Sequence, residues 1–409
     1  MKRWHLMAAL ALTVVALSGA KAQDKAASLP DWVNHIQPFA DLRFRYDETD
    51  NQDTDERVRE RLRARFGADV EVNDSFNMIF ELATSETQPN GQGDPISNNQ
   101  TMTNSFSGKP VWLYLGYFDY HPKQIQGLHI DGGKMNNPFY IPATNQLIWD
   151  RDLTPEGVAL RYSHAFGAFE PFLNIGNFWI TERYTSSGDQ DTSDKWTELT
   201  GFQGGTKVNL ADNKVYLKAG VGNFYYSRTK GWSVIGPSTS FAGNSSVTKD
   251  IDGKATSVYD NTYNLMEYNG EVGGKIGSVP WIIYGDYVIN NGITTKDSGV
   301  FVKENPKDNI GYIAGVSIGS YDKPLGLAVR YYYRYLQKDA VIGAFCDSDD
   351  SGGGTDNHGN TVGLDLGLYK NVWASLTYYM DVTKISEDNP SDDRGRNYHR
   401  LFVDLNVKF

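Results

Sequence analysis

The sequence predicts an all-β protein, a transmembrane antiparallel β-barrel of about 16 strands with short turns at one end and long loops at the other. Three observations predict this fold. Apolar and polar residues alternate along segments long enough to cross a bilayer as tilted strands. The connectors between these segments are alternately short and long. Beyond the first 22 residues, no stretch approaches the roughly 18 uninterrupted apolar residues that a spanning helix needs.

The alternation is clearest in the last segment of the chain. Leu401, Val403, Leu405, Val407 and Phe409 are apolar, whereas most residues between them are polar. A period of two places these two sets on opposite faces of one strand. The same pattern predicts strands at 36–46, 57–72, 75–86, 111–121, 127–134, 157–165, 169–183, 196–209, 214–227, 263–276, 280–291, 309–319, 325–338, 360–369, 372–383 and 397–409.

Connector length is the strongest sign of a membrane barrel. Short turns such as 73–74, 166–168 and 370–371 alternate with long loops. An even strand number, short periplasmic turns and long extracellular loops are typical of outer-membrane barrels. A soluble β-sandwich would also alternate, but it would not readily explain connectors sorted by length. The long loops are expected at 47–56, 87–110, 135–156, 184–195, 228–262, 292–308, 339–359 and 384–396.

The first 22 residues are predicted to be a secretory signal peptide. Lys2 and Arg3 precede an apolar run at 7–20, and the small residues Ala20 and Ala22 predict cleavage after Ala22. An N-terminal membrane anchor is the alternative, although the apolar run is short for one. Residues 23–35 are then a short periplasmic entry segment, and residues 36–409 form a single barrel domain.

Composition excludes several functional classes. A formal charge of −11 is that of a poor nucleic-acid binder, because phosphate binding needs a positive surface. The single cysteine, Cys346, leaves no intrachain disulfide and no cysteine-rich metal site. Ser163 and His164 are adjacent in a predicted strand, so they face opposite ways and cannot act as a catalytic pair. We therefore predict no enzyme activity, no cofactor and no metal.

One acidic loop could instead bind a metal ion, although the signal is weak. Asp347, Asp349, Asp350 and Asp356 carry oxygen ligands on a glycine-rich segment, and such ligands suit Ca²⁺. A solvated acidic loop is the simpler interpretation of the same residues.

A run of alternating arginines predicts a charged inner wall of the barrel. Arginine occupies every second position near the start of the second strand, at Arg57, Arg59, Arg61, Arg63 and Arg65. Each guanidinium would cost about 2–4 kcal/mol at the bilayer midplane, so these side chains are expected to face the lumen or the outer interface. Arg43 and Arg45 lie on the neighbouring strand. The prediction is a cationic wall that serves transport, is paired with acidic residues for solubility, or does both.

The third long loop, 135–156, is unusually apolar for a solvated segment. It contains Phe139, Ile141, Leu147, Ile148 and Trp149, which need cover from water. Folded into the lumen, the loop would bring three acidic residues opposite the arginines, namely Asp150, Asp152 and Glu156. Opposed charges across a narrow aqueous gap select and orient polar solutes. The alternative is a loop packed on the barrel rim or against a neighbouring copy of the chain.

These features resemble a known family. The leader, the sixteen-strand layout and the terminal Phe409 resemble the general architecture of Gram-negative outer-membrane porins. The alternating arginines at 57–65 and the runs at 133–139 and 149–157 resemble those of the putative-porin family of such membranes. The resemblance covers most of residues 36–409.

The resemblance implies a passive diffusion channel for ions and small hydrophilic solutes, surrounded by outer-membrane lipid and lipopolysaccharide and assembled as a homotrimer. It also implies that the barrel assembly machinery reads Phe409, and positional analogy makes loop 135–156 the constriction. A non-conducting barrel that acts as an adhesin or structural protein is the alternative. Weak cation preference is expected because acidic residues are abundant on the predicted inner face, at Asp119, Asp131, Glu267, Glu271, Asp286 and Asp365.

Deleting Phe409, or the substitution Phe409→Asp, should reduce insertion into the outer membrane, because the terminal strand would lose the residue that the assembly machinery is expected to read. The measurement is the amount of heat-modifiable barrel in the outer-membrane fraction. An undiminished amount would contradict the assigned signal.

Overall fold

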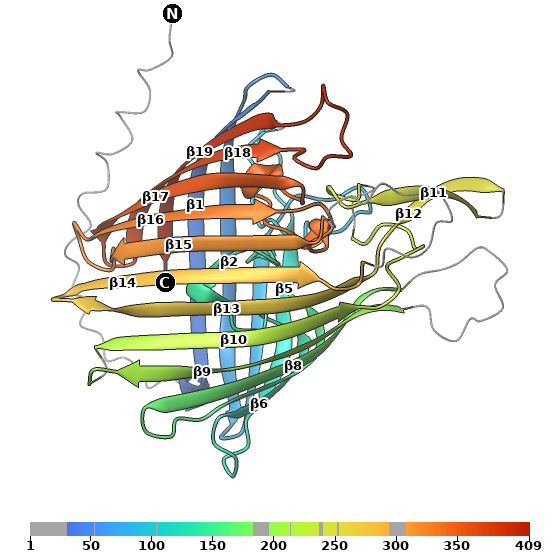
Figure 1. The fold of residues 1–409 in the computed structure, drawn as a ribbon. Coiled ribbons are helices and arrows are strands. Elements are labelled where there is room, and N and C mark those ends of the chain that lie inside the picture. Colours follow the sequence, from blue (N-terminus) through green and yellow to red (C-terminus); the bar gives the residue numbers. More distant parts are fainter. Residues whose placement is uncertain are drawn as a thin grey trace, which may run out of the picture.

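The computed structural model describes residues 31–52, 54–103, 105–182, 196–212, 214–236, 240–251, 253–293 and 308–409. Its main element is a closed antiparallel barrel of 16 long strands (Figure 1). The barrel strands are β1 (Ile36–Asn51), β2 (Arg57–Asn73), β3 (Phe76–Thr84), β5 (Val111–Tyr120), β6 (Leu128–Lys134), β7 (Glu156–Ser163), β8 (Phe169–Glu182), β9 (Trp196–Leu210), β10 (Val215–Tyr226), β13 (Tyr263–Ile276), β14 (Val279–Asn290), β15 (Ile310–Gly319), β16 (Leu327–Leu336), β17 (Asn357–Tyr369), β18 (Val372–Thr383) and β19 (Arg396–Lys408).

Four short 3₁₀ helices accompany the strands in the described part of the chain: η1 (Asp31–His35), η2 (Pro142–Thr144), η3 (Gly343–Phe345) and η4 (Asp350–Gly352). No helix among the described residues has the length and hydropathy needed to cross a membrane. The predicted leader, 1–22, and most of the predicted entry segment lie outside the described residues, and so do most of the predicted loops 184–195 and 292–308.

β1 closes the barrel, because it pairs with both β2 and β19. In the ladder with β19, Asp41 lies opposite Lys408 and Asn51 lies opposite Tyr398. At the end of the chain, the N–H of Phe409 donates to the carbonyl oxygen of Ala40 at 2.8 Å. Closure removes the open sheet edge that could not be tolerated in hydrocarbon.

Each of the predicted strands corresponds to one barrel strand, so the predicted fold class is confirmed. β1 continues to Asn51, beyond its predicted end, and β17 begins at Asn357, before its predicted start. The pattern did not indicate β4 (Gln100–Thr101), which pairs with β2, or the hairpin of β11 (Ser246–Ile251) and β12 (Lys254–Tyr259) within loop 228–262. Elements this short do not sustain an alternation that can be recognised.

The alternation sorts strand residues between the outer and inner faces of the barrel. Outward side chains such as Phe44, Phe66 and Leu173 are large, apolar and exposed. In the final strand, Leu405 is 45% exposed, whereas its neighbour Asn406 is 7% exposed and borders the interior cavity. This arrangement gives a lipid-facing apolar surface and a mostly polar interior near β1, β2 and β19.

The rest of the interior is not the open, water-filled lumen that a barrel of 16 strands can enclose. Near their long-loop ends, β8 to β10 and β13 to β16 turn apolar side chains inward. Loops 135–156 and 337–356, together with Ile235 and Tyr259 of segment 228–262, pack over them. Burial of each large apolar side chain contributes about 1.5–3 kcal/mol, which holds the loops inside the barrel. The cluster includes Leu147, Trp149, Ile235, Val341 and Phe345 from the loops and Phe178, Phe224, Leu265, Val288 and Leu336 from the strands.

The register of β19 predicts unequal effects for two adjacent substitutions. Leu405→Arg places a charge on the lipid face, at a cost of up to about 2–4 kcal/mol that falls towards the interface. It should lower the yield of assembled barrel. Asn406→Arg points into the interior and should assemble normally. The measurement is the heat-modifiable fraction of each variant, and equal yields would contradict the register.

Candidate functional site

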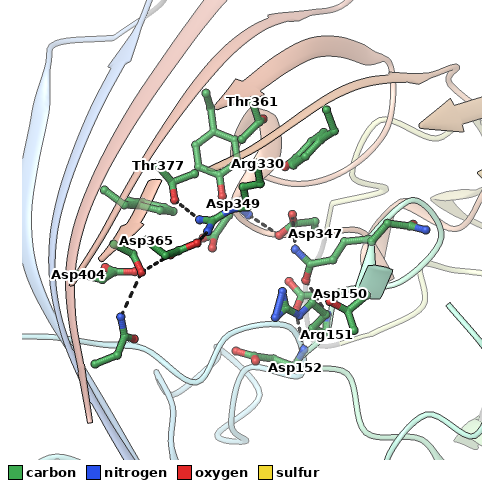
Figure 2. A pocket seen from close by; sticks show the side chains of 18 of the residues that line it. Asp150, Arg151, Asp152, Arg330, Asp347, Asp349, Thr361, Asp365, Thr377 and Asp404 are labelled. Carbon is green, nitrogen blue, oxygen red and sulfur yellow. Dashed lines mark hydrogen bonds and ion pairs between the residues drawn. The ribbon is translucent and has the colours of Figure 1, made fainter. Parts of the chain in front are cut away.

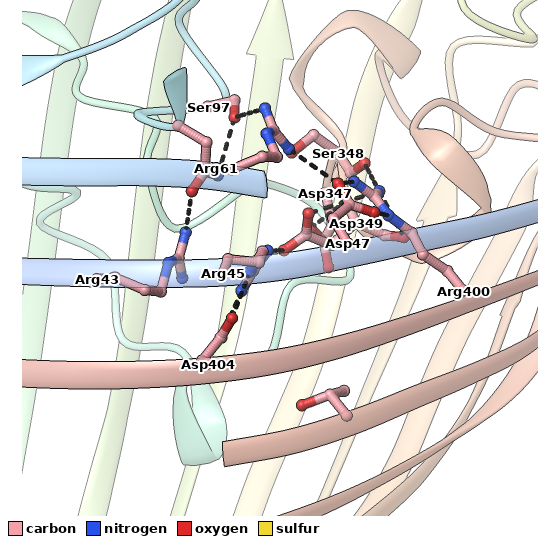
Figure 3. A network of polar contacts seen from close by, with 12 residues as sticks. Arg43, Arg45, Asp47, Arg61, Ser97, Asp347, Ser348, Asp349, Arg400 and Asp404 are labelled. Carbon is pink, nitrogen blue, oxygen red and sulfur yellow. Dashed lines mark hydrogen bonds and ion pairs between the residues drawn. The ribbon is translucent and has the colours of Figure 1, made fainter. Parts of the chain in front are cut away.

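The arginine wall lies on the inner face of β1 and β2, as Figure 3 shows in part. Outward residues such as Val58 and Phe66, which are 48% and 51% exposed, alternate with it along β2. Arg57 lies at the exposed end of β2 and is not part of the wall. The wall comprises Arg43, Arg45, Arg59, Arg61, Arg63 and Arg65, with Arg43 opposite Arg63 and Arg45 opposite Arg61 across the ladder.

Two aspartates on the same face of β1 neutralise much of the wall. Asp47 is fully buried, and its Oδ2 lies 2.6 Å from Arg59 Nη2 and 3.5 Å from Arg61 Nη1. Asp41 Oδ1 lies 2.9 Å from Arg63 Nη2. An unpaired buried charge is strongly destabilising, so these carboxylates are what allow the arginines to pack side by side.

Arg43 differs from the other wall residues, because its partner is neutral. Its Nη2 donates to Asn99 Oδ1 at 2.6 Å. Within the described residues, no carboxylate oxygen lies within 4.0 Å of its guanidinium. Arg43 also borders the main cavity. Among the described residues, Arg43 therefore borders that cavity with no carboxylate in direct ion-pair contact.

Loop 135–156 crosses the interior and touches opposite walls. On one side, the N–H of Tyr140 donates to Gln203 of β9 at 2.6 Å, and the N–H of Ala143 donates to Glu271 of β13 at 2.7 Å. On the other side, Asp152 Oδ1 lies 2.5 Å from Arg65 Nη2 of β2. The loop is therefore inside the barrel and does not lie on its rim.

Aromatic packing fixes the course of this loop. Phe139 stacks on Trp149 with ring centroids 5.7 Å apart, and it meets Phe224 of β10 edge-on at 4.8 Å. The indole N–H of Trp149 donates to the hydroxyl of Tyr226 at 2.8 Å. These are the apolar residues whose need for cover predicted a packed loop.

The three predicted acids of loop 135–156 take different positions. Asp152 joins the arginine wall: burial alone would raise its pKa, but Arg65, Arg63 and Arg43 outweigh burial and hold the pKa below its ordinary value. Asp150 is buried beside the wall, where burial first and the charge of Asp152 second raise its pKa well above the usual range. Its carboxylate accepts the N–H groups of Asp152 and Ser348.

Glu156 does not face the arginines, contrary to the expectation from sequence. It is the first residue of β7, its side chain is 61% exposed, and its Oε1 pairs with Lys134 Nζ at 3.0 Å. The cause is strand register, because Lys134 lies directly opposite Glu156 on β6. Glu156 therefore belongs to a surface ion pair.

A second loop, 337–356, also enters the interior, which the sequence did not predict. Asp349 Oδ2 lies 3.2 Å from Arg45 Nη1, and Asp349 Oδ1 lies 3.6 Å from Arg400 Nη1 of β19 (Figure 3). Arg400 Nη2 pairs with Asp47 at 2.9 Å. Gln146 donates to Asp347 at 2.6 Å and so joins the two loops.

The sequence carries a signal for this second loop. Ala340, Val341, Ile342 and Phe345 are apolar, as in loop 135–156, and they pack in the same buried cluster. The acidic residues after them, which the sequence left open as Ca²⁺ ligands, instead accept hydrogen bonds from neighbouring side chains. Asp350 accepts the hydroxyl of Tyr332 at 3.0 Å. Among the described residues, these carboxylates do not form a group with metal-ligand spacing.

A cavity of about 430 Å³ lies between the arginine wall and the two loops (Figure 2). Its lining reaches Tyr321 and Trp373 near the short turns. Its lining also includes Arg45, which pairs with Asp404 at 2.8 Å and with Asp349 at 3.2 Å. The charged residues that line it include Arg43, Arg63, Arg151, Arg330, Asp150, Asp152, Asp347 and Asp365.

Comparison with known proteins identifies a matching family and similar solved structures. A family model described as "Putative porin" matches residues 48–275 and 279–409. The structure of OprB from Pseudomonas putida aligns over 92% of this chain and 95% of that chain, at 10% identity and a TM-score of 0.57. The outer-membrane channel DcaP of Acinetobacter baumannii aligns over 91% and 97% of the two chains, at 10% identity and a TM-score of 0.47. A search of curated proteins found no match.

Asp349→Ala should loosen loop 337–356. It removes the contacts to Arg45 and Arg400 but leaves these arginines paired with Asp404 and Asp47. The free energy of local opening should fall by about 1–3 kcal/mol, which speeds amide hydrogen exchange roughly tenfold to a hundredfold. The control is Asp393→Ala, which removes an exposed ion pair with Lys384. An unchanged rate of amide hydrogen exchange in loop 337–356 would show that Asp349 does not hold this loop against the wall.

Proposed function

Because this chain belongs to the putative porin family and is an outer-membrane channel of a Gram-negative bacterium, we propose that it lets ions and small hydrophilic solutes diffuse passively across that membrane. The observation that carries the proposal is the charged cavity between the arginine wall and the two inward loops. A polar cavity inside a closed barrel suits hydrated solutes, whereas an apolar ligand would find little buried hydrocarbon there.

The proposed selectivity region consists of the arginine wall, loop 135–156 and loop 337–356. Charges more than about 8 Å from a solute are largely screened at physiological salt. Groups that border the cavity therefore act on a passing ion, whereas the acidic residues of exposed loops do not. Arg43 and Asp152 both line the cavity, at the wall, and are its proposed charge-selecting residues.

We propose a weak anion preference for the cavity, in place of the weak cation preference that the acidic residues of the chain favour. Within the described residues, Arg43 and Arg151 border the cavity without a carboxylate partner, whereas Arg63 and Arg330 are paired. Burial raises the pKa of Asp347 well above its ordinary value, with Asp350 and Asp150 adding to the shift, so this acid carries less charge than its residue type suggests.

A non-conducting barrel is the second candidate, because a buried apolar cluster fills part of the interior near the long loops and the Arg45–Asp349 ion pair ties loop 337–356 to the wall. A barrel blocked in this way could serve as an adhesin or a structural protein. The assembly partners are further proposals that rest on the family alone: a homotrimer in lipid and lipopolysaccharide, inserted by the barrel assembly machinery.

Substitutions at the cavity should move the reversal potential in a salt gradient. A unit charge about 8 Å from an ion contributes ~0.5 kcal/mol in water before screening. Arg43→Gln should therefore lower the anion-to-cation permeability ratio about twofold, and Asp152→Asn should raise it. Both shifts should shrink in high salt.

The matched control is Lys123→Gln, which removes an equal charge from an exposed turn where Lys123 pairs with Asp74. It should leave the reversal potential unchanged. Equal shifts for Arg43→Gln and Lys123→Gln would place the selectivity region elsewhere in the molecule.

A further inference from the structure

A cluster of two histidines and one aspartate lies outside the selectivity region, on the hairpin of β5 and β6. Asp119 lies near the end of β5, and His121 directly follows that strand. His129 is the second residue of β6. Each contributes one candidate ligand atom, and these atoms lie within 4.8 Å of one another. Among the described residues, this is the one group with such spacing.

Strand register brings the three side chains together. Asp119 lies opposite Asp131, and Tyr120 lies opposite Ile130. Continuing this ladder by one pair places His121 opposite His129, with ring centroids 5.7 Å apart. Phe118, Tyr120 and Ile130 are exposed on the outer face. The alternating residues Asp119, His121 and His129 therefore point into the barrel, close to the short-turn mouth.

The distances suit a small divalent ion. His129 Nδ1 lies 2.9 Å from Asp119 Oδ2, and His121 Nδ1 lies 3.6 Å from Asp119 Oδ1. Ligand atoms at the corners of a tetrahedron around Zn²⁺ are about 3.4 Å apart, given bonds of about 2.1 Å. The two imidazole-to-carboxylate separations lie on either side of this value, and the three candidate ligand atoms lie within 4.8 Å of one another.

His121 supplies a second, independent indication. Its Nδ1 is buried and has no hydrogen-bond partner among the described residues. An unsatisfied buried nitrogen costs free energy, and a metal ion would remove that cost. The position is also fixed by the backbone, because the N–H of His121 donates to the carbonyl oxygen of Ser75 at 2.9 Å.

The surrounding charges permit a cation. Arg161 Nη2 lies 3.5 Å from Asp119 Oδ2, which taken alone would oppose metal binding. However, Arg161 is held by Asp131, with its Nε 2.6 Å and its Nη2 3.1 Å from the two carboxylate oxygens. Asp131 therefore offsets the charge of Arg161. Beyond the triad, His129 and Arg161 border a second cavity of about 260 Å³, which leaves room for a water ligand.

We propose that Asp119, His121 and His129 bind a divalent transition-metal ion, with Zn²⁺ as the best-fitting ion, at the short-turn mouth of the barrel. Two imidazoles and one carboxylate favour Zn²⁺ or a neighbouring transition metal over Ca²⁺ and Mg²⁺, which prefer oxygen ligands alone. The fourth position faces the second cavity and stays open to water. This site is independent of whether the barrel conducts.

Calorimetric titration of the folded, detergent-solubilised full chain with Zn²⁺ tests the site. One saturable site per chain is expected, and excess Ca²⁺ or Mg²⁺ should not displace the ion. His129→Gln should weaken Zn²⁺ binding by more than about tenfold, since loss of even a residue that only supports a ligand typically costs 10-fold to 100-fold. The control is His164→Ala, because His164 lies at the same end of the barrel but outside the triad. It should bind as the unmodified chain does.

A second readout separates metal ligation from a structural role. Co²⁺ in a tetrahedral nitrogen and oxygen site absorbs visible light, so this absorption should appear on titration of the unmodified chain and be lost in Asp119→Asn. Heat-modifiable mobility reports whether each variant is folded. Absence of a saturable Zn²⁺ site in the unmodified chain, or unchanged affinity in folded His129→Gln, would overturn the proposal and leave a hydrogen-bonded histidine–aspartate cluster.

Discussion

The organisation of the interior depends on one constraint, which is that apolar side chains on the inner face of β8 to β16 must be covered. Phe178, Phe224 and Leu336 would otherwise face water inside the barrel. Loops 135–156 and 337–356 supply most of the cover, through residues such as Trp149 and Phe345, and Ile235 of segment 228–262 adds to it. The larger polar cavity thereby lies on the side of the barrel that carries the arginine wall.

Charge pairing then decides where the loop ends lie. A buried guanidinium needs an acidic partner, and β1 alone supplies too few for the arginine wall. Asp152 of one loop pairs with Arg65, and Asp349 of the other pairs with Arg45, which Asp404 of β19 also contacts. Apolar burial therefore brings the loops inside, and ion pairs fix their tips against the wall. Arg43 is left with a neutral partner, Asn99, and so remains available to a solute.

The barrel could be predicted from the sequence because alternation and connector length report strand faces and strand order directly. The arrangement of side chains and loops inside the barrel was harder to predict from the sequence. Glu156 was expected beside the arginines, but a cross-strand neighbour, Lys134, holds it outside. The role of Asp349 was missed because its acidic segment suggested a solvated loop, although the apolar residues before it carry the opposite signal. The Asp119–His121–His129 group depends on hairpin register, which no linear motif records.

The central claim is that a polar, charged path persists beside the packed loops of this outer-membrane channel. Single-channel current through the unmodified protein in planar bilayers tests it most directly. The structure predicts discrete current steps, small for a barrel of this size because the loops occupy much of the interior, with anions carrying the larger share. A correctly folded, inserted barrel that gives no current steps would contradict the claim and favour the non-conducting alternative.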